Sequence, residues 1–165
     1  MAKLVEEVLA FSKAETIPDR ETPEDIDLRE LLPNILAREA PENGIKLEIG
    51  DIQLHSLRNA LDRAIGNIIR NAIRYAKDIE ITAKAENSRI VIQIADRGPG
   101  VPEEALSRLF EPFYRPEAAR GRTTGGSGLG LAITKRCIEA CRGTVTAQNR
   151  EGGGLLVSIA LPITI

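Results

Sequence analysis

Residues 57–75 read LRNALDRAIGNIIRNAIRY, and this stretch decides the fold. Its apolar side chains recur with the period of a helix that is buried on one face. The apolar stripe consists of Leu57, Leu61, Ala64, Ile65, Ile68, Ala72 and Ile73. The stretch therefore predicts a long amphipathic helix, which needs other elements to cover its stripe.

On the C-terminal side of this helix the pattern predicts mostly strands. Alternating apolar and polar side chains indicate strands, and glycine-rich or polar stretches indicate the turns between them, one of them at Glu86, Asn87 and Ser88. The pattern predicts strands at residues 79–85 and 89–95, a short helix at 103–109, and a longer helix at 129–142 with Gly143 at its C′ position. Two final strands are predicted at 144–149 and 155–161.

The N-terminal side predicts a linker, a helix and a hairpin. Residues 1–15 have a helical apolar pattern and are interpreted as the end of another element, and two prolines mark residues 16–25 as a linker. A helix is expected to start with Asp27 as its N-cap, and Pro33 should kink or shorten it. Two apolar runs, 46–49 and 52–55, flank Gly50-Asp51, which suits a two-residue hairpin.

This order of elements predicts an α+β fold. We expect a two-layer α/β sandwich, in which helices cover one face of a mixed, mostly antiparallel sheet. Residues 26–165 are enough for a single domain with a sizeable core.

Composition excludes several classes of function. The formal net charge is −2, from 22 Lys and Arg against 24 Asp and Glu, so no nucleic-acid partner is expected. There is neither a long apolar span nor a signal-peptide pattern. Cys137 and Cys141 lie four residues apart in the predicted helix, and we interpret them as buried thiols in a reducing compartment rather than as metal ligands.

Three polar side chains share one narrow face of the long helix. Asn67, Asn71 and Arg74 lie within about 60° of one another at the helical period. An amide oxygen is a suitable neutral ligand for Mg²⁺, and an arginine beside it can hold a phosphate. The alternative interpretation is a solvated helix face.

Two glycine-containing stretches have residues that suit the binding of a nucleotide. Asp96 directly follows a strand and precedes Gly98 and Gly100, so its carboxylate could accept a hydrogen bond from the amine of adenine; the alternative is an ordinary turn. Residues 125–131 run into a helix and expose backbone N–H groups, which suits a phosphate cradle. The length and composition of the loop before them are typical of a mobile lid over a ligand; the alternative is a disordered surface loop.

These motifs, taken in order, resemble the N, G1, F and G2 boxes of sensor histidine kinases, at residues 67–75, 96–100, 110–115 and 126–131. The resemblance covers roughly residues 26 to 162. It implies the Bergerat-type fold that these kinases share with type II topoisomerases, mismatch-repair ATPases and heat-shock chaperones. It also implies ATP and Mg²⁺ as ligands.

The resemblance implies a role for each motif residue. Asn71 would bind Mg²⁺, and Asn67 would support the metal and the phosphates. Arg74 would contact a phosphate, Tyr75 would pack near the ribose or base, and Asp96 would recognise the adenine amino group. The remaining expected ATP-binding residues are Gly98, Gly100, Val101, Tyr114, Arg115, Gly126, Ser127, Gly128, Leu129, Gly130 and Leu131.

The chain departs from the family pattern at two places. Ser127 stands where relatives commonly have threonine, which keeps the hydroxyl. Ser56 and Leu57 stand where Gly-Asp often opens the N-box helix, so a different helix cap is expected.

No residue of this chain fits the phosphate acceptor. His55 is the only histidine, and Ser56 and Leu57 follow it, whereas an acidic residue follows the acceptor in this family. We therefore interpret His55 as structural and expect no catalytic residue in this chain. The chain should bind ATP and donate its γ-phosphoryl group to a histidine outside it.

The resemblance also implies partners and a location. Residues 1–15 resemble the tail of the dimerisation helix, so the expected partners are the dimerisation and histidine-phosphotransfer domain of the parent kinase and a response regulator. The chain should be cytoplasmic and without direct membrane contact, with a parent protein anchored in the inner membrane. The alternatives are a degenerate module that docks a response regulator or partner kinase, and an ATPase or anti-sigma serine kinase of the same superfamily.

Overall fold

The computed structural model describes residues 21–42, 44–76, 78–114 and 130–165. In chain order its elements are β1 (Glu24–Asp27), α2 (Leu28–Glu39), β2 (Lys46–Ile49), β3 (Gln53–Ser56), α3 (Arg58–Tyr75), β4 (Glu80–Glu86), β5 (Arg89–Ala95), α4 (Glu103–Leu106), α5 (Gly130–Ala140), β6 (Thr144–Asn149) and β7 (Leu155–Pro162). The long helix predicted from residues 57–75 is α3.

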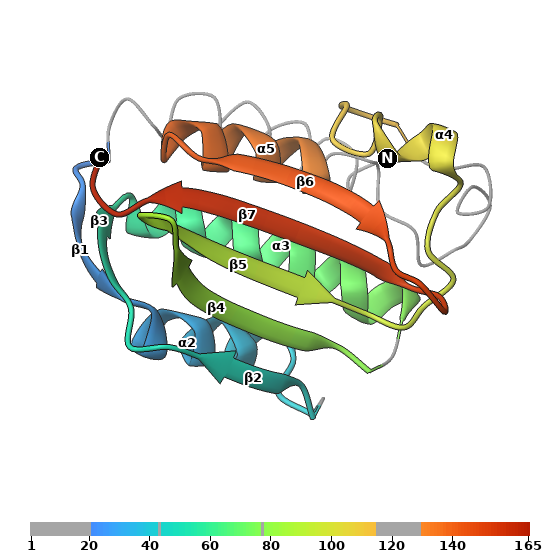
Figure 1. The fold of residues 1–165 in the computed structure, drawn as a ribbon, viewed down its shortest axis with the longest axis horizontal. Helices are drawn as coiled ribbons and strands as arrows, with labels where there is room; N and C mark the ends of the chain where they lie inside the picture. Colours follow the sequence, from blue (N-terminus) through green and yellow to red (C-terminus); the bar gives the residue numbers. More distant parts are fainter. Residues whose placement is uncertain (1–20, 43, 77, 115–129) are drawn as a thin grey trace, which may run out of the picture.

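The main sheet is mixed and mostly antiparallel, as predicted. Its five strands lie in the order β2-β4-β5-β7-β6, and among them only β2 and β4 pair in parallel. Figure 1 shows α2, α3 and α5 together behind the sheet, on the same face. The two-layer α+β sandwich is therefore confirmed.

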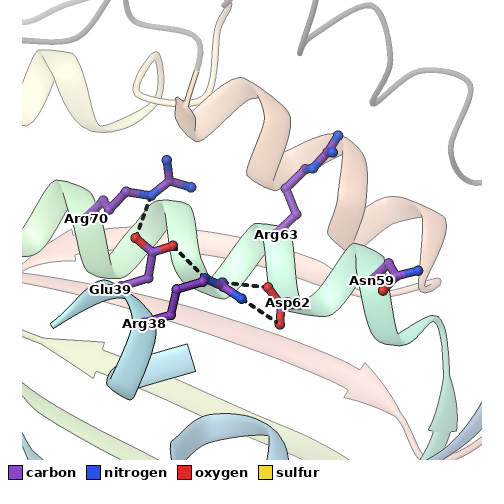
Figure 2. A pocket seen from close by; sticks show the side chains of 6 residues that line it. All are labelled: Arg38, Glu39, Asn59, Asp62, Arg63 and Arg70. Carbon is purple, nitrogen blue, oxygen red and sulfur yellow. Dashed lines mark hydrogen bonds and ion pairs between the residues drawn. The ribbon is translucent and has the colours of Figure 1, made fainter. Parts of the chain in front are cut away.

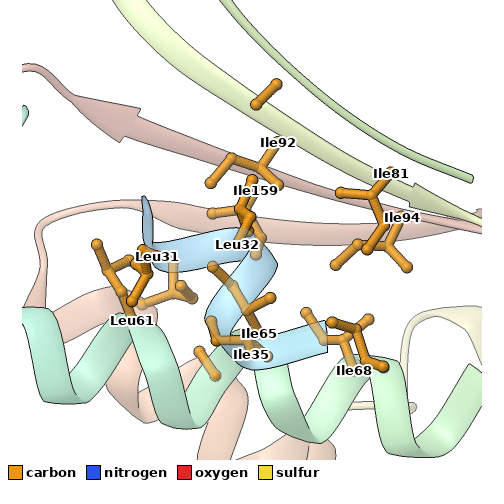
Figure 3. Packing of buried hydrophobic residues seen from close by; sticks show 14 of the residues in the cluster. Leu31, Leu32, Ile35, Leu61, Ile65, Ile68, Ile81, Ile92, Ile94 and Ile159 are labelled. Atoms are coloured by element: carbon orange, nitrogen blue, oxygen red, sulfur yellow. The ribbon is translucent and has the colours of Figure 1, made fainter. Parts of the chain in front are cut away.

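The core lies between this helical layer and the sheet. Figure 3 shows leucine and isoleucine side chains of α2 and α3 facing isoleucines of β4, β5 and β7. In the predicted stripe of α3, Leu61 and Ile65 are fully buried, and Ile73 is only partly buried. On its other side α3 contacts α5, where the buried hydroxyl of Thr134 donates to the Ala64 carbonyl at 3.3 Å. No helix in the described part of the chain is long and apolar enough to cross a membrane.

The predicted hairpin at residues 46–55 is wrong. β2 pairs in parallel with β4, and β3 pairs antiparallel with β1 in a separate two-stranded sheet. The Gly50 N–H donates to the Ala83 carbonyl at 3.0 Å, so the backbone after β2 continues along β4 and does not fold back. β1 begins at Glu24, inside the segment that was expected to be a linker.

Helices α2 and α5 each differ from expectation in one feature. Asp27 caps α2 as predicted, accepting from the Arg29 N–H at 2.9 Å, but the helix continues past Pro33 to Glu39 and is not shortened. Burial of α2 against the core offsets the helical hydrogen bond that proline removes. At the end of α5 the left-handed residue is Arg142, with φ of 58°.

Gly143 is needed for a close approach rather than for its backbone conformation. A Cβ at Gly143 would lie 2.6 Å from the Ala160 carbonyl oxygen on β7. The assignment of Gly143 to the left-handed C′ position is therefore wrong, because the turn after α5 places that conformation one residue earlier.

Candidate functional site

The C-terminal half of α3 presents the polar face that the sequence predicted. Asn67 and Asn71 are half-buried, and Arg74 is exposed. The Asn67 amide is engaged at both ends: Nδ2 donates to the Gly130 carbonyl at 3.3 Å, and Oδ1 accepts from Arg70 Nη2 at 2.6 Å. The Asn71 amide makes no hydrogen bond with any residue that the structure describes. Of the two asparagines, Asn71 has the oxygen available for a ligand.

Arg70 belongs to a ladder of charged groups that joins α2 to α3 (Figure 2). Glu39 forms an ion pair with Arg70, with Oε2 3.0 Å from Nε, and its Oε1 accepts from Arg38 Nε at 3.1 Å. Arg38 in turn binds both oxygens of Asp62, at 2.6 and 3.2 Å. The hydrogen bonds that Arg38 donates to Asp62 and, with a smaller effect, to Glu39 raise the pKa of Arg38, so the guanidinium remains charged.

The ladder lies in an open groove of about 460 Å³. The groove is lined by Arg38, Glu39, Asn59, Asp62, Arg63 and Arg70 and includes none of the predicted ligand residues. Four of its charged groups, Arg38, Glu39, Asp62 and Arg70, pair with one another, so we interpret this ladder as a brace between α2 and α3 that ends at Asn67. Arg63 Nη1 is buried and has no hydrogen-bond partner among the described residues.

Asp96 stands at the end of β5, where its carboxylate is fixed on one side only. Oδ1 accepts from the Gly98 N–H at 2.9 Å and from the Leu155 N–H at 3.1 Å. The residue is 9% exposed, and its Oδ2 has no hydrogen-bond partner within the described ranges. Two backbone donors thus hold the carboxylate in place while one oxygen remains available to an N–H donor.

Gly98 brings this loop onto the end of α3. A Cβ at Gly98 would lie 2.7 Å from the Cβ of Ala76 and 3.0 Å from the Tyr75 carbonyl oxygen. Only glycine allows the two segments to approach so closely. The predicted adenine-recognising carboxylate and the predicted metal and phosphate face therefore lie at the same end of α3.

Val101 is held by a residue that the sequence interpretation missed. Asn149, the last residue of β6, accepts from the Val101 N–H at 2.9 Å and donates to its carbonyl at 2.6 Å. Arg150 also reaches the loop, donating from Nη1 to the Asp96 carbonyl at 2.9 Å. Neither residue carries a local signal, because only the β6–β7 hairpin brings them to this loop.

The F and G2 motifs are described in part. Phe113 is 57% exposed with a φ of 65°, and the Arg108 guanidinium lies 4.4 Å from the centre of the Tyr114 ring. Gly130 and Leu131 form the first turn of α5. Arg115, Gly126, Ser127, Gly128 and Leu129 lie outside the described residues, as does the predicted lid.

The start of α3 has the unusual cap that its sequence suggested. Leu57 occupies the N-cap position and provides no side-chain hydrogen bond. The carboxylate of Glu21 replaces it, accepting from the Asn59 N–H at 2.6 Å and from the Ala60 N–H at 3.1 Å. A carboxylate here satisfies helix N–H groups and complements the positive end of the helix dipole.

His55 lies on β3, near the N-terminal end of α3. Its Nδ1 is 2.9 Å from Asp25 Oδ1, across the β1–β3 pair. Asn71 lies in the other half of α3, about 20 Å further along at 1.5 Å per residue. Most of the length of α3 therefore separates His55 from the predicted phosphate-binding face.

Comparisons with known proteins show the family of this chain. Residues 56–165 match the family described as "Histidine kinase-, DNA gyrase B-, and HSP90-like ATPase". The chain is 42% identical to the sensor histidine kinase CpxA of Escherichia coli K12 over 139 residues, which are 81% of the chain and 30% of CpxA. It is 32% identical to the sensor protein kinase WalK of Staphylococcus epidermidis, over 100% of the chain and 29% of WalK.

A solved structure shows the same architecture. Full-length ShkA in complex with AMPPNP superposes with a TM-score of 0.78 and 27% identity, over 96% of this chain and 35% of ShkA. The chain thus spans about a third or less of the length of these relatives.

Proposed function

Because the chain belongs to the family of histidine kinase-, DNA gyrase B- and HSP90-like ATPases, we propose that it binds ATP with Mg²⁺ and donates the γ-phosphoryl group to a histidine outside it. Its relatives CpxA and WalK are sensor kinases, and this chain matches about 30% and 29% of their lengths. The proposal assigns residues 26–165 to the catalytic domain and residues 1–15 to the tail of the dimerisation helix.

The single observation that carries the proposal is the environment of Asp96. A buried carboxylate with one oxygen held by two backbone N–H groups is a preorganised acceptor for an exocyclic amine. A base with an amino group there would lie beside the end of α3, because Gly98 packs on Tyr75 and Ala76. The phosphates would then extend along α3 toward Asn71 and Gly130.

The residues present fit an Mg²⁺ ion bound together with phosphates. Mg²⁺ prefers oxygen ligands and keeps several waters, so one neutral amide oxygen from the protein is a suitable contribution. The Asn71 amide meets this requirement, and exposed Arg74, one turn further along α3, can contact a phosphate. When bound, the ion would neutralise charge on the phosphates during transfer.

The proposed acceptor lies in another domain or chain. His55 is paired with Asp25 at the opposite end of α3, so it would not meet a phosphate bound near Asn71. We infer that the partner is a dimerisation and histidine-phosphotransfer domain, with a response regulator as the next acceptor, and that the reaction occurs in the cytoplasm. The chain's own contribution is to bind, orient and stabilise charge.

Nucleotide titration and transfer in trans test this proposal. ATP should bind more tightly with Mg²⁺ than without it, and a separately produced dimerisation domain from a relative should acquire acid-labile phosphohistidine. No binding at millimolar ATP would overturn the proposal. Binding without transfer would favour a docking module, whereas steady phosphate release or phosphoserine in a partner would favour another activity of the superfamily.

A further inference from the structure

We propose that Asn149 is a positioning residue that sets one wall of the base pocket by holding Val101 at a fixed distance from Asp96. The proposal rests on the proposed binding of ATP and deepens it. It assigns a role in base recognition to the hairpin between β6 and β7, which lies outside the N, G1, F and G2 motifs.

The Asn149 side chain holds Val101 as a neighbouring strand would. Its carbonyl oxygen accepts from the Val101 N–H at 2.9 Å, and its amide nitrogen donates to the Val101 carbonyl at 2.6 Å. Both polar backbone groups of one residue are thus satisfied by a single side chain. Asparagine can do this because its amide has the same donor and acceptor as a peptide group.

The backbone before Val101 is shaped to accept this side chain. Gly100 has a φ of 70°, a conformation that glycine adopts at little cost. A Cβ at Gly100 would lie 2.7 Å from Asn149 Oδ1, so the side chain fills the space that a larger residue would need. The contact therefore requires both the glycine and the asparagine.

The same hairpin also holds Asp96. Asn149 pairs with Leu155 across the β6–β7 ladder, and the Leu155 N–H donates to Asp96 Oδ1 at 3.1 Å. Arg150 and Gly154 contact the Asp96 carbonyl region from the turn between them. The paired residues Asn149 and Leu155 thus fix the two ends of the loop from Asp96 to Val101. They thereby set the width of the pocket that is available to a flat base.

The test exchanges the amide for an isosteric carboxylate. Asn149→Asp keeps the acceptor for the Val101 N–H but places a second oxygen against the Val101 carbonyl. We expect about tenfold weaker binding of ATP and of ADP, because repulsion between the carboxylate and the Val101 carbonyl oxygen replaces a hydrogen bond. The ratio of ATP affinities with and without Mg²⁺ should not change, and the affinity for Mg²⁺-tripolyphosphate, which has no base, should be that of the wild type.

Gln148→Glu is the matched control. It makes the same change from amide to carboxylate one residue earlier on β6, at an exposed position. This variant should bind ATP, ADP and tripolyphosphate as the wild type does. Asn149→Ser, which removes the two-point contact without adding charge, should lose ATP affinity in the same pattern as Asn149→Asp.

The outcomes separate this proposal from the proposed function. If the wild type binds ATP and Asn149→Asp binds it equally well, the role of Asn149 is overturned and ATP binding stands. A loss that extends to tripolyphosphate, or unfolding of both Asn149 variants by circular dichroism, would overturn it too, making Asn149 a residue of general stability. If the wild type binds no nucleotide, the proposed function and this inference both fail.

Discussion

At the scale of single residues, the two oxygens of Asp96 have different surroundings. Oδ1 is held by the N–H groups of Gly98 and Leu155, and Oδ2, which has no hydrogen-bond partner among the described residues, is the oxygen that we propose accepts from the base. The sequence predicted a carboxylate at this strand end from its position before two glycines. It could not predict the contact of Asp96 with Leu155 or that of Val101 with Asn149, because these partners lie 59 and 48 residues further along the chain.

Asp96→Asn tests this division. The new amide can keep its oxygen toward the two backbone N–H groups, and its NH₂ group then faces the adenine amine, so that two donors meet. Leaving donors unpaired costs about 1–3 kcal/mol, which predicts ATP binding weaker by about five- to 150-fold. Isothermal titration measures it, and Asp51→Asn at an exposed turn is the control; unchanged affinity in Asp96→Asn would contradict the assignment.

The two N-box asparagines should differ in their dependence on Mg²⁺. In Asn71→Ala the ratio of ATP affinities with and without Mg²⁺ should fall toward one, since the available amide oxygen is lost. In Asn67→Ala that ratio should remain close to the wild-type value, because the Asn67 amide is bonded to Arg70 and Gly130. Titrations with and without Mg²⁺ check this, and a larger loss of Mg²⁺ dependence in Asn67→Ala would reverse the roles.

At the scale of elements, α3 was predictable because its apolar stripe repeats over many turns. The pairing of short strands was not. Residues 46–49 and 52–55 flank a plausible two-residue turn, yet β2 and β3, which they form, enter different sheets whose partner strands are distant in sequence. β1 was missed because its sequence, EDID, holds a single apolar residue, Ile26, which is fully buried.

The cap of α3 gives a prediction about stability. Glu21 holds the backbone N–H groups of Asn59 and Ala60, so Glu21→Ala should lower the free energy of unfolding by about 1 kcal/mol. Urea denaturation at neutral pH measures this change. Glu42→Ala, at an exposed turn, is the control and should have almost no effect. Equal stability of Glu21→Ala and the wild type would mean that the cap contributes nothing.

At the scale of the whole molecule, the helical layer and the sheet together bury both thiols. Cys137 is 1% exposed and Cys141 fully buried, as the sequence interpretation expected. Burial raises the pKa of Cys137 to about 11 and also raises that of Cys141. Neutral, buried thiols are unreactive, so modification by a thiol reagent should require global or local unfolding.

This pKa shift has a definite sign in the pH dependence of stability. Above the ordinary thiol pKa the Cys137 thiol loses its proton in the unfolded chain but retains it in the folded chain. Its contribution to the free energy of unfolding is therefore fully present below about pH 8.5 and is lost as the pH rises toward 11. The slope from Cys137 should approach about 1.4 kcal/mol per pH unit. Urea denaturation from pH 8 to 10.5 should show a steeper loss for the wild type than for Cys137→Ala, in which this titration is absent and other groups still titrate. Parallel plots of unfolding free energy against pH for the two proteins would show that the Cys137 thiol ionises equally well in the folded chain. Water would then reach this side chain of α5.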